Sequence, residues 1–293
     1  MQIVGLKYIS PLLLVIPLSI LLLSACGTAE SGNQTAAPKS SRMYTWMIAD
    51  SALQRLEQAD ASGTLAKTYF DTADTYLMGA SSASIPAQWQ STLTAVFSSF
   101  ADLQKAFALH KIPRSVKAIV YDNEAWSFTP TQEQQHPELY DRLAAELVHQ
   151  YHLIFIATPA TNLAQIINPV SGNRYENFLH LGIAGEAARY ADVYEIQAQG
   201  SEMNTAVYAT FVKQAVAQAR AANPHIRVLA GLSTNPSGHQ VTGEDLYRAV
   251  VATQDSVSGY WLNIPMGGSR CPKCGTSHPQ VAVDFLKKLS TQS

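Results

Sequence analysis

The sequence predicts an α/β protein of the (β/α)8-barrel type, on three observations. Short apolar runs alternate with stretches of helical periodicity from residue 43 to residue 293, which is the pattern of a parallel sheet. The runs are rich in Val, Ile, Leu, Tyr and Trp, as in strands that are buried on both faces. Neither GxGxxG nor GxxxxGK[ST], the glycine fingerprints of open nucleotide-binding sheets, occurs in the chain. The open doubly wound sheet remains the alternative architecture.

Seven apolar runs are candidates for strands. A barrel of this class has eight strands, so either one strand is hidden in the long segment 81–116 or the barrel is incomplete. In chain order, the seven runs lie near residues 44–48, 74–79, 117–124, 153–158, 191–199, 226–233 and 258–264.

The stretches between the runs have the residue spacing of amphipathic helices. One helix is expected after the third run, with Leu139, Leu143 and Leu147 on its apolar face. Another is expected over 207–219, where apolar residues fit the helical period closely. The last helix is expected to begin at Pro279, since proline is favoured in the first turn of a helix.

The first 26 residues have the features of a lipoprotein signal peptide. A positive charge at Lys7 precedes an apolar run, which ends in Leu23-Ser24-Ala25-Cys26. This ending resembles a bacterial lipobox, in which cleavage leaves Cys26 as a lipidated N-terminus. Residues 27–42 are small and polar, as in a flexible tether. The prediction is an extracytoplasmic protein that is lipid-anchored to the bacterial cell membrane, with 43–293 as a single barrel domain. An uncleaved anchor helix and an ordinary secretory signal are the alternatives.

Charge and cysteine content limit the possible partners. The chain has 20 basic and 22 acidic residues and no basic block, so no nucleic-acid partner is expected. Apart from Cys26, the cysteines are Cys271 and Cys274, and outside the cytoplasm such a pair predicts a disulfide. Half of a zinc ribbon with His278, or two free thiols, are the alternatives. A closed zinc site needs four ligands and the chain has no second CxxC, so neither a metal nor a cofactor is expected. The oligomeric state is not indicated.

Polar residues gather at the ends of the runs, where a barrel keeps its functional groups. Asp122 and Glu124 end the third run and share one face by strand alternation. Glu124 is the predicted general acid, its pKa raised by Asp122, and Asp122 would orient it or stabilise positive charge. Glu195, in the fifth run, is predicted to act as base or nucleophile across the mouth. The predicted substrate-binding residues are Tyr194, Gln197, Gln199, Asn235, Trp261 and Asn263.

Carboxylates, amides and an indole are the side chains that proteins use to bind sugars. Gln197 and Asn263 would bond hydroxyl or acetamido groups, and Trp261 would stack on a sugar ring. The alternative is a polar barrel rim of hydrogen-bonded strand ends, with Trp261 packed in the core.

The run YDNE, residues 121–124, resembles a shortened form of the DxxDxDxE strand of chitinase-like (family 18) glycoside hydrolases. The resemblance implies that Glu124 is the acid, that Asp122 is the preceding aspartate, and that Trp261 is the tryptophan four strands further along. Two departures are that Val120 stands where the motif has a further acid and that the acidic strand is counted third, where the family has it fourth. The runs YDNEAWSFTPTQEQ, IQAQ and WLN also resemble an uncharacterised family of secreted barrel proteins.

These observations predict a surface-tethered lipoprotein with a glycoside hydrolase-like barrel that acts on a carbohydrate by carboxylate acid–base catalysis. A non-catalytic lipoprotein that binds a carbohydrate or another small polar ligand on the same scaffold is the first alternative. A solute-binding lipoprotein of a transporter is the second, but it needs two lobes and a hinge, and the chain has no mid-chain linker that would supply them.

Overall fold

Eight parallel strands pair in chain order, and the last pairs with the first to close a barrel. This computed structural model describes residues 43–79, 88–169 and 172–291; the predicted signal peptide 1–26, with Cys26, and the tether 27–42 lie outside them. The strands are β1 Thr45–Ala49, β2 Thr75–Met78, β3 Thr92–Phe97, β4 Ala118–Tyr121, β5 Ile154–Ala157, β6 Val193–Ile196, β7 Arg227–Ser233 and β8 Gly259–Asn263.

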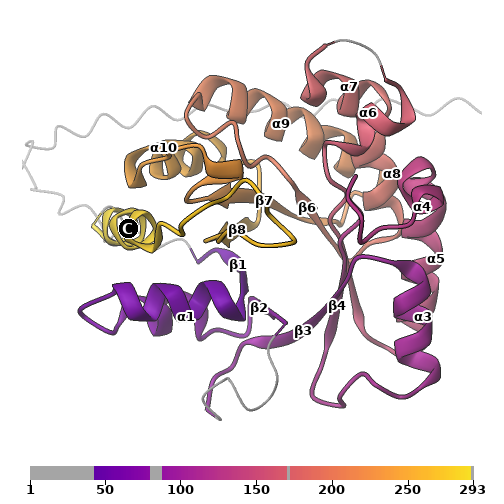
Figure 1. Cartoon of the computed structure of the whole chain (residues 1–293), viewed down its shortest axis with the longest axis horizontal. Coiled ribbons are helices and arrows are strands. Elements are labelled where there is room, and N and C mark those ends of the chain that lie inside the picture. The colour runs from indigo at the N-terminus through magenta and orange to yellow at the C-terminus, as the bar shows by residue number, and fades with distance from the viewer. Residues whose placement is uncertain (1–42, 80–87, 170–171, 292–293) are drawn as a thin grey trace, which may run out of the picture. The chain divides into compact units, whose positions relative to one another are not determined.

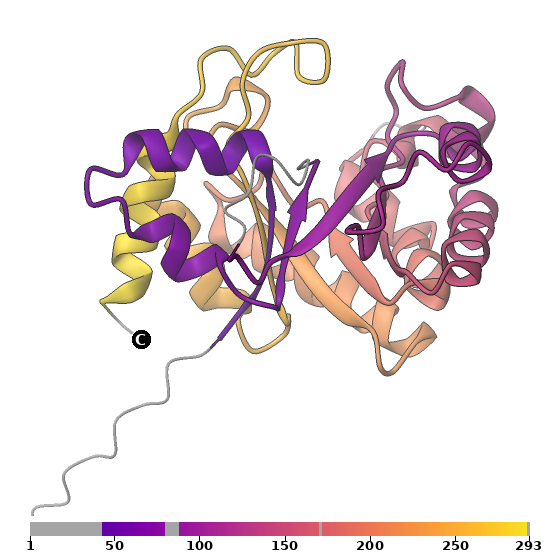
Figure 2. The same ribbon diagram turned by 90° about the horizontal axis from the view of Figure 1, so that it is seen from below.

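Helices surround the strands on the outside (Figure 1). The first and last, α1 and α11, pack side by side, so the two ends of the barrel domain meet (Figures 1 and 2). The helices are α1 Asp50–Ala59, α2 Leu65–Phe70, α3 Phe100–Ala108, α4 Thr131–Gln135, α5 Pro137–Gln150, α6 Leu163–Ile167, α7 Arg174–His180, α8 Ile183–Tyr190, α9 Thr205–Ala222, α10 Gly243–Thr253 and α11 Pro279–Ser290, with a short 3₁₀ turn η1 at Pro236–Gly238. Within the described residues, no helix is long and apolar enough to cross a membrane.

The alternation of side chains along the strands divides the core into two layers. One layer fills the barrel and consists of Met47, Tyr76, Met78, Ala118, Val120, Ile156, Val193 and Leu229. Their sequence neighbours face the helices, where they form the larger cluster that includes Trp46, Leu77, Ile119, Phe155 and Tyr194. A strand side chain that reaches the open end of the barrel, its mouth, must therefore alternate in register with an inward-facing residue such as Val120, Val193 or Leu229.

The barrel closes where β8 meets β1, and this junction requires a glycine. Gly259 pairs with Thr45, and a Cβ at position 259 would lie 1.8 Å from the carbonyl oxygen of Thr45. No side chain fits there without separating the two strands.

The predicted barrel is confirmed, and its eighth strand is β3, inside the segment 81–116. The incomplete barrel and the open sheet are therefore wrong. Most residues of β3 are only partly buried, and two of the six are threonines, so the strand lacks the continuous apolar run that marks the others. Because β3 precedes the acidic strand, that strand is β4, the fourth and not the third.

Two helices confirm the sequence patterns and one differs. Helix α9 contains the predicted span 207–219, and α11 begins at Pro279. Helix α5 exists, but Leu139 is 36% exposed, whereas Asp141, Ala144 and Val148 are buried. The contacts of α5 with the barrel and α8 favour small side chains, so the leucines lie beside the buried stripe.

Candidate active site

The acidic residues lie in the loop that follows β4 and not on the strand itself, because β4 ends at Tyr121. The backbone N–H of Asp122 still donates to the carbonyl of Phe97 at the end of β3 (2.8 Å), which continues the sheet by one residue. Asp122 and Glu124 therefore leave the strand at its carboxyl end, where the barrel opens.

Buried hydrogen bonds fix this acidic loop on both sides. Between the two acids, Asn123 is fully buried. Its side-chain amide donates to the backbone carbonyl of Glu133 (3.0 Å), and its backbone carbonyl accepts from the N–H of Ala160 (2.9 Å). The Glu133 carboxylate accepts from the hydroxyl of Tyr121 at 2.6 Å. These bonds hold the backbone between Asp122 and Glu124 in place.

Asp122 is 7% exposed and lies at the base of the mouth. Its Oδ1 accepts hydrogen bonds from Thr158 Oγ1 (3.2 Å) and Gln197 Nε2 (3.1 Å). Burial raises the pKa of Asp122 from 3.8 to about 6, against the lowering effects of these donors and of the Arg270 charge. Asp122 is therefore ionised at neutral pH.

Glu124 is the acid that keeps its proton. Burial, with the charge of Asp122, raises the pKa of Glu124 from 4.5 to about 8, against a hydrogen bond from Gln197 and the charge of Arg270. At pH 7 the pair consists of one neutral and one ionised carboxyl group, which is the division of roles that acid–base catalysis needs.

Glu195 lies deeper than either acid. It is fully buried on β6 in the inward phase of Val193, and it lines neither cavity of the mouth. Within the described part of the chain, neither of its carboxylate oxygens has a hydrogen-bond partner. Burial, with the charges of Asp122 and Glu124, raises the pKa of Glu195 well above its ordinary value. Glu195 is therefore fully enclosed and has no face open to a substrate.

The mouth contains a polar cavity of about 680 Å³. Several predicted residues meet there: Glu124, Gln197, Gln199, Trp261 and Asn263 all line it. The Gln199 side chain lies against the backbone of β7, where a Cβ on Gly231 would come within 2.3 Å of the amide. Because Gly231 has no side chain, the Gln199 side chain has room to pass over it and reach the cavity.

A second cavity, of about 390 Å³, adjoins the first over β1 to β5. Asp122, Trp261 and Arg270 line it, and the last two also line the polar cavity. Its other walls include the apolar side chains Met47, Met78, Val96 and Val120. The Trp261 Nε1 donor is buried and has no partner among the described residues, so it is available to a bound ligand.

Tyr194 and Asn235 do not reach the mouth. Tyr194 is fully buried in the outward phase of β6 and packs in the cluster that faces the helices. The side chain of Asn235 is turned to the loop between β8 and α11, where its amide donates to the carbonyls of Cys274 (3.0 Å) and Thr276 (3.1 Å). Neither lines either cavity, so the arrangement gives Tyr194 a packing role and Asn235 a role in holding this loop.

The predicted disulfide between Cys271 and Cys274 is present and closes this same loop. Both cysteines are consumed by this bond, so the zinc and free-thiol alternatives do not apply to them. Within the described ranges, no group of three or more His, Cys, Asp or Glu side chains could hold a metal ion.

The mouth also contains residues that the sequence analysis missed. Trp126, Asn162, Arg174, Arg270 and Lys273 line the polar cavity. The Trp126 indole N–H donates to Thr129 Oγ1 (2.8 Å). In this orientation the Arg270 guanidinium lies over the ring face. The only signals were the aromatic residue two places after Glu124 and the cations beside the cysteines, and neither pattern is specific by itself.

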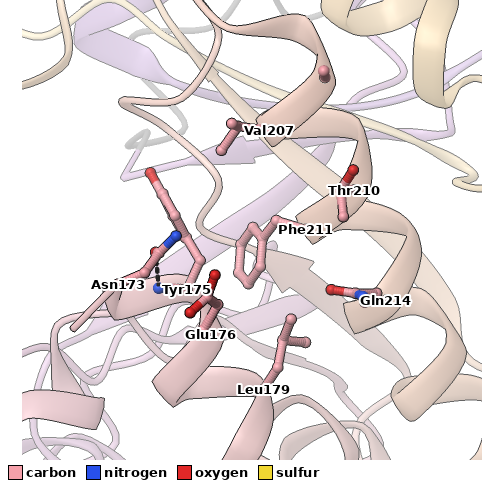
Figure 3. Close-up of a pocket in the computed structure, with 9 residues that line it drawn as sticks. Asn173, Tyr175, Glu176, Leu179, Val207, Thr210, Phe211 and Gln214 are labelled. Atoms are coloured by element: carbon pink, nitrogen blue, oxygen red, sulfur yellow. Dashed lines mark hydrogen bonds between the residues drawn. The ribbon is translucent and has the colours of Figure 1, made fainter.

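A separate groove of about 360 Å³ lies on the outer layer, between α7 and α9 (Figure 3). Tyr175, Glu176 and Leu179 face Val207, Phe211 and Gln214 across it. None of the predicted site residues lines this groove, and Glu176 is its one acid among the described residues. The acid–base pair therefore assigns the candidate site to the barrel mouth.

Comparison with known proteins gives likeness in structure but not in sequence. No protein-family model matches the chain, and no curated protein matches it in sequence. A family 18 chitinase from Pseudoalteromonas aurantia superposes with a TM-score of 0.50 at 9% identity, over 85% of this chain and 100% of that chain. A family 17 β-1,3-glucanosyltransferase from Rhizomucor miehei gives a TM-score of 0.45 at 11% identity, over 83% of this chain and 98% of that chain.

The barrel of a glycoside hydrolase is thus among the solved structures that this chain resembles, and at 9% identity the likeness shows only the fold. The acids follow the fourth strand, so the count that placed them after the third, one of the two departures from the family 18 motif described above, was wrong. The resemblance to an uncharacterised secreted family stays a prediction.

Proposed function

We propose that the barrel hydrolyses a glycosidic bond, with Glu124 as the general acid and Asp122 as the ionised carboxylate. The observation that carries this proposal is the pair itself: two acids on one fixed loop, with pKa values of about 8 and about 6. Glycoside hydrolases need one acid that keeps its proton at working pH and one that has lost it.

In this proposal Glu124 donates its proton to the leaving oxygen as the bond between sugar and oxygen breaks. The sugar then carries positive charge, which the Asp122 carboxylate stabilises. Water attacks the cation and gives a proton to the Glu124 carboxylate, which completes the hydrolysis and restores the acid. Gln197 links the two acids, since its amide donates to Asp122 Oδ1 (3.1 Å) and its side chain also interacts with Glu124. Its third contact, to the carbonyl of Thr158 (3.0 Å), fixes the amide so that both acids keep one orientation.

Substrate binding is assigned to the walls of the two cavities. Asn263, Gln199 and Asn162 offer amides to hydroxyl groups, and the unpartnered Trp261 indole adds a donor where the cavities meet. The combined volume suits a short stretch of a sugar chain. Tyr194 and Asn235 are not assigned to this role.

A non-catalytic carbohydrate-binding protein is the second candidate, favoured by one observation. Glu195, the predicted second catalytic carboxylate, is fully buried and lines neither cavity. A binding protein would keep Trp261 and the amides but would need no proton donor.

Turnover distinguishes the two candidates. The wild-type protein is screened against chromogenic glycosides and cell-wall polymers for release of dye or reducing ends. The enzyme hypothesis expects hydrolysis that falls by roughly two to four orders of magnitude in Glu124→Gln. Glu176→Gln, which removes an exposed acid in the groove between α7 and α9, serves as the control and should keep full activity. Sugar binding without hydrolysis in the wild type would favour the second candidate.

We further propose that the protein is held at the outer face of the cell membrane by lipid on Cys26. The lipobox-like ending Leu23-Ser24-Ala25-Cys26 and the polar tether after it support this. Changing Cys26 to Ser should block processing or release the protein from membrane fractions. Unchanged membrane attachment, with no lipid found on the mature wild-type chain, would contradict the proposal.

A further inference from the structure

One wall of the polar cavity is a covalently closed loop. Residues 266–276 join β8 to α11 and stand out from the barrel (Figure 2), and residues 270–274 line the cavity. The disulfide between Cys271 and Cys274 closes the tip. The Gly267 N–H donates to the carbonyl of Gly275 (2.6 Å) and closes the base.

A neighbouring loop fixes this wall against the barrel. The buried amide of Asn235 donates to two of its carbonyls, as described above. Gly238, three residues later, packs directly against the backbone of this loop: a Cβ at position 238 would lie 2.3 Å from the carbonyl oxygen of Lys273. One disulfide, several internal hydrogen bonds and a buried amide clamp hold the backbone from which the side chains of this loop project.

The side chains that the wall presents to the cavity are cations. Arg270 immediately precedes the first cysteine and Lys273 lies between the two, and both are exposed and line the cavity. The Arg270 guanidinium lies 5.7 Å from the centre of the Trp126 ring and 5.6 Å from that of Phe128. Neither cation has a hydrogen bond or ion pair to any described residue, so their donors are free.

The acids near these cations do not neutralise the wall. Glu124 is protonated at pH 7, so of the two acids only the buried Asp122 carries a negative charge near Arg270, and the two form no ion pair. Arg174 lines the same cavity and adds a third positive charge, while burial raises the pKa of the nearby Glu202 to about 7. Lys273 forms no ion pair with any described residue. Positive charge therefore gathers at the exposed rim, above acids that lie deep in the mouth.

We infer that this disulfide-closed wall binds an anionic group, so that the substrate is an acidic polysaccharide that carries carboxylate or sulfate groups. The inference rests on the proposed function of the mouth. A guanidinium and an ammonium with free donors on a closed loop form charge-assisted hydrogen bonds to such groups, which are stronger than bonds between neutral partners. The deep acids would act on the bond to be broken, while the rim holds the charge of a neighbouring sugar.

Binding is measured by titration calorimetry in the Glu124→Gln background, which prevents turnover. The probes are tetrasaccharides of hyaluronan (carboxylate), chondroitin 4-sulfate (carboxylate and sulfate) and chitin (neutral). We expect at least one acidic probe to bind about tenfold more tightly than the neutral one, with an advantage that shrinks as salt is raised. The two acidic probes distinguish a carboxylate from a sulfate preference.

Two double variants test the wall itself. R270Q/K273Q should weaken binding of the acidic probe about tenfold more than binding of the neutral probe, and so remove the advantage of the acidic probe. K213Q/K287Q removes the same charge from exposed positions on α9 and α11 and should change neither. C271S/C274S should weaken the acidic probe as R270Q/K273Q does, because the loop that carries the cations is no longer closed by its disulfide.

Equal or tighter binding of the neutral probe would overturn the inference and leave the proposed hydrolase intact. Equal losses for all probes in R270Q/K273Q would overturn it as well, since the loop would then act by shape. If no acidic tetrasaccharide binds, the inference fails, whereas the proposed function fails separately if the wild type hydrolyses nothing in the screen of glycosides and cell-wall polymers.

Discussion

Replacing Glu124 with Gln should make the protein more stable, and by an amount that depends on pH. Glutamine has the shape of a protonated glutamate and keeps an oxygen that can accept the hydrogen bond from Gln197. What it removes is the titration of a buried carboxyl group beside the charge of Asp122.

The magnitude follows from the pKa of Glu124, which folding raises from 4.5 to about 8. Between these values the folded protein binds a proton that the unfolded chain has lost, so the stability of the wild type falls as pH rises from 4.5 to 8. At 1.36 kcal/mol for each pH unit above 4.5, the destabilisation is about 1 kcal/mol at pH 5 and about 3 kcal/mol at pH 7. The variant has no such group, so it should exceed the wild type by about these amounts.

Urea denaturation at pH 5, 6 and 7 measures this difference, with Glu176→Gln as the control for a change in net charge at an exposed position. The stability gap between variant and wild type should widen as pH rises for Glu124→Gln alone. A variant that is less stable than the wild type at pH 7, or a gap that narrows with pH, would refute the reasoning and show that Glu124 is a structural hydrogen-bond acceptor.

Three further predictions concern the same mouth. Turnover should follow a bell-shaped pH profile with limbs near pH 6 and pH 8, because Asp122 must lose its proton and Glu124 must keep it; a profile with no alkaline limb below pH 9 would contradict this assignment. Gly231→Ala should displace the Gln199 amide and raise KM several-fold with little change in melting temperature; an unchanged KM would remove Gln199 from the site. Asn235→Ala should lower the unfolding free energy by about 1–3 kcal/mol, because it leaves carbonyls of the disulfide loop without their donor; an unchanged melting temperature would show that the clamp is not needed.

Much of the scaffold could be predicted from the sequence because seven strands are buried on both faces and therefore read as apolar runs. The eighth, β3, is half-buried and threonine-rich, so the same criterion could not find it. In α5, small residues make the contact and the leucines lie to one side, so the apolar pattern indicated the helix but not its buried face.

The site was only partly predictable for a related reason. Alternation along a strand placed Glu195 on the inward face correctly, but the depth of a residue depends on where each strand begins and how the barrel staggers. Glu195 therefore lies inside the barrel, below the mouth. Gln197 and Gln199 follow the end of β6 and line the polar cavity of the mouth. Tyr194 has the opposite phase and faces the helices. Arg270 and Trp126 lie in the loops after β8 and β4 and contact each other only in the folded protein, so no local sequence pattern predicts their contact.

The central claim, that Glu124 gives its proton to a leaving oxygen, is tested most directly by the dependence of turnover on the leaving group. Wild type and Glu124→Gln are compared on a pair of aryl glycosides of the sugar found in the screen, one with a dinitrophenol leaving group and one with phenol. Dinitrophenolate departs without a proton, whereas phenolate needs one. The account predicts that the variant keeps kcat within about tenfold of the wild type on the dinitrophenyl glycoside and loses roughly two to four orders of magnitude on the phenyl glycoside. Equal losses on both substrates would contradict it.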